Sequence, residues 1–136
     1  MQKGTLKPLI TYYLALFGLG LTTVTVGPTL PGLAQQVNVD IGEISILISA
    51  KEIGHLFGAL LLVRLLDKMN GNKALGIFIL TTAFLLIFFP FIPQLVILAI
   101  LIFALGLFSA GIDSGTNTLT IWTFKEKSAT TLNGLH

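Results

Sequence analysis

Two long stretches without a charged residue, 8–39 and 74–112, dominate this sequence of 136 residues. A helix needs about 20 apolar residues to cross roughly 30 Å of hydrocarbon, and both stretches exceed that length. Only 10% of the residues are charged and 54% are hydrophobic, whereas a soluble domain carries about a quarter charged residues. We therefore expect an integral membrane protein of the cytoplasmic (plasma) membrane.

Turn signals divide these stretches into four predicted helices. The polar segment "QQVNVDIGE" ends the first span, and "PFIPQ", with Pro90 and Pro93, interrupts the second uncharged stretch. A cleaved signal peptide is the alternative for the first span, but its apolar run is longer than the usual h-region of about 7–15 residues. We expect an all-α membrane protein with spans at about 9–34, 44–66, 74–92 and 95–122.

The distribution of Lys and Arg predicts the topology. These residues occur before the first span, between the second and third, and after the fourth, so the positive-inside rule places both termini in the cytoplasm. They form no run that could bind nucleic acid, and the chain has no cysteine. The positions counted are Lys3 and Lys7, then Arg64, Lys68 and Lys73, and finally Lys125 and Lys127.

The fourth predicted span contains a carboxylate, Asp113, followed one turn later by Asn117. Helical spacing puts both on one face with Gly106, and counting about 1.5 Å per residue from Trp122 places Asp113 about 14 Å into the membrane. Because charged groups inside a membrane are costly, the sequence predicts a substrate- or proton-binding site. The alternative is an ion pair between Asp113 and Arg64 or Lys68.

The second predicted span contains Lys51, Glu52 and His55. Counting from Arg64 gives His55 the same depth as Asp113, so a proton relay between the two is one interpretation, in which His55 and Glu52 join Asp113 and Asn117 as predicted substrate- or proton-binding residues. The other is that Lys51 extends to the outer surface while Glu52 and His55 satisfy each other. Two further residues in GxxxG spacing, Gly54 and Gly58, predict close helix packing, as does Gly106.

The loop between the second and third spans, "VRLLDKMNGNK", resembles the motif G-x-x-x-D-[RK]-x-G-[RK]-[RK] of the major facilitator superfamily. Asp67 and Lys68 match the D-[RK] pair, Gly71 the next glycine after one extra residue, and Lys73 a closing base. Val63 replaces the first glycine, which departs from the motif. With Arg64, the four matching residues are implied to form a gating loop.

Two other segments, "GPTLPGLAQQ" and "GLFSAGIDSGTNTL" followed by "LNGLH", resemble the fucose-permease and sodium-dependent glucose transporter branch of that superfamily. The resemblance implies that Asp113 and Asn117 line a sugar path. The fucose permease has a further carboxylate in its first span, and this chain has none there.

The resemblance implies the N-terminal part of a secondary carrier, within a six-helix bundle. Such a carrier is a symporter for a sugar or similar small polar solute, coupled to H⁺ or Na⁺, without a cofactor or bound metal. Its partners would be the lipid bilayer and the missing C-terminal helices or another subunit. The chain lacks the residue groups of an intramembrane enzyme. The alternatives are a small four-span protein that acts by self-assembly or in a partner complex, and a non-functional remnant.

Overall fold

The structure, a computed structural model, describes residues 6–124. Within that range the chain is helical and contains no strand, which confirms the predicted all-α class. A short linker separates α2 from α3, and a single 3-10 turn, η1, continues α4 toward the bend before α5. The helices are α1 (Leu6–Val37), α2 (Ile41–Ile44), α3 (Ile46–Lys68), α4 (Gly71–Phe88), η1 (Phe89–Phe91) and α5 (Leu95–Phe124).

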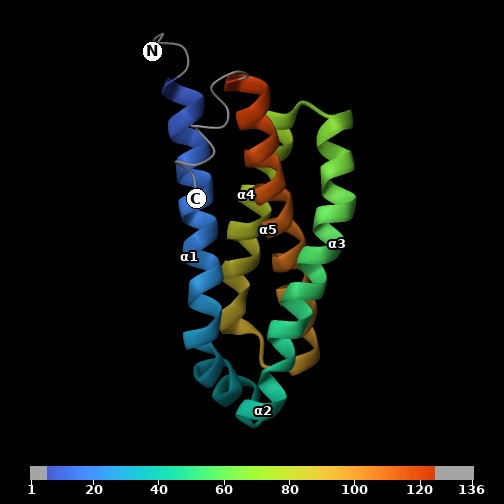
Figure 1. The fold of residues 1–136 in the computed structure, drawn as a ribbon. Helices are drawn as coiled ribbons and strands as arrows, with labels where there is room; N and C mark the ends of the chain where they lie inside the picture. Colours follow the sequence, from blue (N-terminus) through green and yellow to red (C-terminus); the bar gives the residue numbers. More distant parts are fainter. Residues whose placement is uncertain (1–5, 125–136) are drawn as a thin grey trace.

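Four segments of the described chain are long and apolar enough to cross a membrane, as the uncharged stretches predict. The helices run alternately in opposite directions, so the start of α1 and the end of α5 lie at the same end of the bundle (Figure 1). The side of the membrane on which that end lies stays a prediction. The four segments are Pro8–Val37, Ile41–Leu66, Gly71–Phe91 and Leu95–Thr123.

The central helix is α5, which contacts α3, α4 and α1. In Figure 1, α5 lies between α1 and α3, with α4 behind it. Its buried residues occur on several sides of the helix, unlike those of the other three long helices, whose apolar side chains are largely exposed. The bundle therefore uses α5 as its core element and leaves much of the surface of α1 uncovered.

The contact between α3 and α5 brings the two backbones together. A Cβ atom added to Gly54 would overlap the backbone carbonyl of Phe103, and one added to Gly58 would overlap that of Leu107. The partners in each pair are 49 positions apart in the sequence, so α3 and α5 run parallel in a fixed register. Helices in membranes pack in this way through small residues, because lipid supplies no hydrophobic force between them.

A third glycine completes this contact from the other helix. A Cβ atom on Gly106 of α5 would overlap the carbonyl of Lys51 and lie 3.0 Å from the amide nitrogen of His55. The backbone of α3 around Lys51 is therefore pressed directly against α5, at the level of Gly106.

Helix α1 is attached to the bundle near its two ends. At the start of the helix, the Tyr12 hydroxyl donates a hydrogen bond to Asn72 Oδ1 at 3.1 Å and lies 3.4 Å from Thr123 Oγ1. At the far end, Gln36 Nε2 donates to the carbonyls of Phe89 and Ile92, at 2.8 and 2.6 Å. These contacts join α1 to the ends of α4 and α5.

The buried apolar residues form two clusters that follow the same division. One cluster surrounds Tyr12, and the other surrounds Leu33 and Ala34 near the end of α1. Between them, the glycines of α1 have no neighbouring atom where a Cβ would lie. These open positions are Gly18, Gly20, Gly27 and Gly32.

Replacing Gly58 with alanine is expected to destabilise the chain by about 2 kcal/mol, because the new methyl group meets backbone that cannot rotate away. The matched control is Gly20→Ala, where nothing lies within 4 Å. Alanine favours a helix by about 1 kcal/mol over glycine, so the control should show no loss. Thermal unfolding of the purified chain in detergent, followed by circular dichroism, measures both. Equal destabilisation by the two variants would contradict the close α3–α5 contact.

Candidate functional site

The polar pair predicted on the fourth span, Asp113 and Asn117, lies on α5, and both residues are half-buried. Asn117 Nδ2 donates a hydrogen bond to Asp113 Oδ1 at 3.3 Å. This bond uses one acceptor site of the carboxylate and leaves the others open, because an ionised carboxylate offers about four such sites. The pair is therefore held in place without being saturated.

Two oxygens on this side of α5 are buried and have no hydrogen-bond partner. They are Asn117 Oδ1 and Ser109 Oγ, the latter one turn before Asp113. The hydroxyls of Thr116 and Thr120, by contrast, donate to carbonyls one turn earlier in the same helix, at 2.6 and 2.7 Å. A buried polar group without a partner costs about 1–3 kcal/mol, so these two oxygens mark positions that a hydroxyl or water would satisfy.

The register of α3 and α5 corrects the predicted depth of His55. The glycine contacts join residues 49 to 55 positions apart, so they place Asp113 beside residues 58–64 of α3 and not beside His55. His55 packs beside Gly106, seven positions before Asp113, which corresponds to about 10 Å along the helix. The equal depth on which the His55–Asp113 relay rested is therefore wrong.

Neither basic residue proposed to pair with Asp113 does so in the described part of the chain. Arg64 and Lys68 are exposed on the last turns of α3, and the ion pair found among the described residues joins Lys51 and Glu52. Among the described residues, Asp113 thus has an amide partner and no cationic one.

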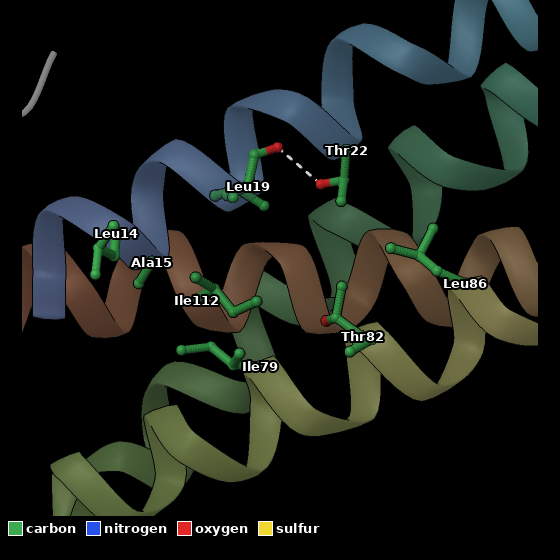
Figure 2. Close-up of a pocket in the computed structure, with 10 residues that line it drawn as sticks. Leu14, Ala15, Leu19, Thr22, Ile79, Thr82, Leu86 and Ile112 are labelled. Atoms are coloured by element: carbon green, nitrogen blue, oxygen red, sulfur yellow. Dashed lines mark hydrogen bonds between the residues drawn. The ribbon is translucent and has the colours of Figure 1, made fainter.

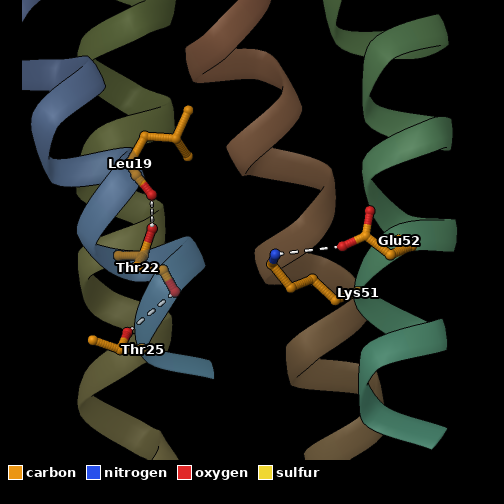
Figure 3. A network of polar contacts seen from close by, with 5 residues as sticks. All are labelled: Leu19, Thr22, Thr25, Lys51 and Glu52. Atoms are coloured by element: carbon orange, nitrogen blue, oxygen red, sulfur yellow. Dashed lines mark hydrogen bonds and ion pairs between the residues drawn. The ribbon is translucent and has the colours of Figure 1, made fainter. Parts of the chain in front are cut away.

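Lys51 does not extend to the surface. Its side chain is 10% exposed, and its ammonium lies 3.5 Å from Glu52 Oε1, whereas the Glu52 side chain is 63% exposed. Glu52 therefore pairs with Lys51 and not with His55, for which no hydrogen bond occurs among the described residues. Figure 3 shows the Lys51 side chain crossing α5 from α3, with its ammonium facing the Glu52 carboxylate.

The segment predicted as a gating loop is mostly helical. Helix α3 continues through Lys68, and only Met69 and Asn70 separate it from α4. Gly71 is the first residue of α4 and is buried against α5, because a Cβ there would lie 2.5 Å from Leu119 Cδ2. Lys73 is exposed in the first turn of α4. The side chain of Asp67, on the last turn of α3, lies outside the described part of the chain.

A groove of about 170 Å³ lies between α1, α4 and α5. Figure 2 shows that most of the side chains around it are aliphatic, with two threonines among them. The Thr22 hydroxyl donates to the carbonyl of Leu19 at 2.7 Å, as expected for a threonine within a helix, and Thr82 Oγ1 is buried without a partner. The groove has no charged group, so it offers little for recognition of a polar solute.

Several contacts of the site were missed by sequence reasoning. Tyr12 gave no signal, and Gln36 and Ser109 were noted only as parts of longer segments, because isolated polar residues in apolar helices resemble many others that bond to their own backbone. Lys51 was noticed only as a snorkelling residue. No group of three metal-ligating side chains occurs among the described residues.

Comparison with known proteins places these features in context. A family model described as "Major Facilitator Superfamily" matches residues 12–136. The chain is 33% identical to sodium-dependent glucose transporter 1 of Danio rerio over 119 residues, which are 88% of this chain and 20% of that protein. It is 32% identical to sodium-dependent glucose transporter 1A of Mus musculus, and the match covers 91% of this chain and 29% of that protein. Sodium-dependent glucose transporter 1 of Homo sapiens is also 32% identical, and the match covers 88% of this chain and 23% of that protein.

The chain thus spans between a fifth and three tenths of the length of these curated relatives. No solved structure matches it at a significant level.

A double-mutant cycle tests the arrangement of the polar residues. Asp113→Ala and Asn117→Ala should be coupled by about 1 kcal/mol, because their side chains share a hydrogen bond. Asp113→Ala and His55→Ala should be additive within about 0.5 kcal/mol, because the two residues lie on different levels. Thermal unfolding of the wild type, the two single variants and the double variant of each cycle gives both values. Strong coupling between His55 and Asp113 would contradict the register of α3 and α5.

Proposed function

The chain belongs to the major facilitator superfamily, and we propose that it forms part of the N-terminal helix bundle of an ion-coupled carrier for a sugar or similar small polar solute. It contributes binding groups and helix surfaces that change partners during transport. Transport itself requires a second bundle that rocks against the first about a central site, so the proposed partners are the remaining helices of the carrier or another subunit.

The observation that carries this proposal is the unsaturated Asp113–Asn117 pair. A charge at the centre of a membrane helix costs about 2.5–3.5 kcal/mol, and in the described part of the chain no cation pairs with Asp113. Asp113 accepts hydrogen bonds, and Asn117 Oδ1 is a buried acceptor without a partner. Two neighbouring acceptors suit adjacent hydroxyl groups of a sugar, each of which donates one hydrogen.

The coupling ion follows from the same charge balance. Lys51 and Glu52 neutralise each other. The other charged residues of the described membrane segments, Glu43, Arg64 and Lys73, each lie close to a segment end, so the carboxylate of Asp113 is the unbalanced charge in the interior of these segments. A sodium ion or a proton bound there would remove the imbalance and ease movement of the loaded site. The relatives named as sodium-dependent glucose transporters favour Na⁺, with H⁺ as the alternative.

The basic residues near the start of α4 are proposed to control opening at that end. Arg64, Lys68 and Lys73 are exposed there, and Gly71 holds α4 tightly against α5. Exposed cations at the end of a bundle are free to pair with acids of a second bundle and to release them when the carrier opens. Asp67 is proposed to belong to the same gate.

The rival function, assembly through a glycine face, loses its main support in this fold. Gly54, Gly58 and Gly106 are occupied by the α3–α5 contact inside the chain. They are therefore not available as an interface for a second copy.

Replacing Asp113 with asparagine is expected to lower solute uptake at least about 100-fold, because the amide neither binds a cation nor accepts as many hydrogen bonds. Uptake of labelled hexoses into proteoliposomes that contain the full-length carrier, with and without a sodium gradient, measures this. The matched control is Asp40→Asn, which removes an exposed acid outside the long helices and should leave uptake unchanged. Uptake by the Asp113 variant at the wild-type rate would contradict the proposed function.

A further inference from the structure

We propose that Lys51 and Glu52 form a second solute-binding position, one that recognises hydroxyl groups on the same side of α5 as Asp113 and Asn117. This inference rests on the proposed transport of a sugar-like solute. It assigns a role to a lysine that neither the packing of the bundle nor the charge of Asp113 requires.

The first support is the cost of keeping this pair in the membrane. A lysine and a glutamate in adjacent positions do not normally face each other on a helix, yet the ammonium and carboxylate are 3.5 Å apart. Lys51 is the buried member of the pair, with its side chain 10% exposed, and burying an ammonium is costly unless hydrogen bonds complete it. In the described chain Lys51 has Glu52 as its sole side-chain partner, so two of its three donors have no side-chain partner.

The second support is the position of the pair. Gly106 lets the backbone at Lys51 touch α5, and Asp113 lies two helical turns further along, which returns to the same side of the helix. The distance along the axis is about 10 Å. Ser109, with its unpartnered buried hydroxyl, lies between these two levels.

The third support is accessibility. In Figure 3 the Glu52 side chain extends from α3 toward the Lys51 ammonium, which is seen in front of α5. The Glu52 side chain is 63% exposed, and no helix of the described chain covers it. A charged carboxylate inside a membrane cannot remain against lipid without large cost, so we expect the Glu52 side chain to face water and solute in the assembled carrier.

The chemistry of the pair suits a neutral polyol. The ammonium donates to a hydroxyl oxygen, and the free carboxylate oxygen accepts from the same or a neighbouring hydroxyl. A solute that leaves Asp113 and Asn117 would meet these groups next along α5. Because the pair has no net charge, it neither repels nor retains the coupling cation.

The test compares Lys51→Met, Glu52→Gln and the double variant in sodium-driven uptake of D-glucose by the full-length carrier. Each single variant should raise the half-saturating glucose concentration about tenfold, since charge-assisted hydrogen bonds are lost. In the double variant the half-saturating glucose concentration should stay raised. If the pair is only structural, removing both charges should restore wild-type uptake, and this result would overturn the proposal. Changed sodium dependence with unchanged glucose affinity would also overturn it.

A second measurement does not depend on the stability of those variants. The chain has no cysteine, so Glu52→Cys supplies a single thiol in this segment, and Glu43→Cys, exposed on α2, supplies the control. D-glucose at ten times its half-saturating concentration should slow thiosulfonate modification at position 52 about tenfold and leave position 43 unaffected. Equal rates with and without glucose at position 52 would overturn the proposal.

The outcome for Asp113 separates this inference from the proposed function. Wild-type carrier without saturable sugar uptake would contradict both. Loss of uptake in Asp113→Asn together with unchanged affinity in the Lys51 and Glu52 variants would contradict the second binding position alone.

Discussion

The backbone contact between α3 and α5 sets the relative levels of the charged residues on these two helices. Lipid does not drive apolar helices together, so close approach at glycines supplies the packing that a water-soluble core would gain from burial. Gly54, Gly58 and Gly106 remove the side chains that would otherwise separate the two helices. The resulting parallel register fixes the levels of Lys51, His55 and Asp113, and hence which of them can share a solute.

Helix α1 is related to α5 in a different way. It is joined to its neighbours at its two ends, through Tyr12 and Gln36, while its middle carries glycines without neighbours. The threonines of this region donate to their own helix, which satisfies their hydroxyls without a partner helix. The hydroxyl groups in the middle of α1 are thus satisfied within the helix, and such a surface can change neighbours without breaking hydrogen bonds.

The sequence predicted the helices well and their alignment poorly. Uncharged runs report directly on membrane crossing, because the cost of charge in lipid is large, and the GxxxG spacing of Gly54 and Gly58 indicated a packing face. Depth counted from Trp122 and Arg64 assumed that α3 and α5 are perpendicular to the membrane and end at one level. Their register depends on contacts between residues about 50 positions apart, which no local pattern encodes. The burial of Lys51 was missed for the same reason.

The contact of Gln36 with the bend between α4 and α5 links two positions far apart in the sequence. Pro93 has no N–H to donate to the carbonyl of Phe89, four residues earlier, and that oxygen accepts the N–H of Ile92 at 3.5 Å and Gln36 Nε2 at 2.8 Å. Gln36 Nε2 also donates to the carbonyl of Ile92 at 2.6 Å. In lipid an unsatisfied carbonyl is costly, so a side chain at the end of α1 helps to satisfy the backbone of a bend more than 50 positions later in the sequence. The end of α1 and this bend therefore depend on each other, and we expect related carriers to keep or lose them together.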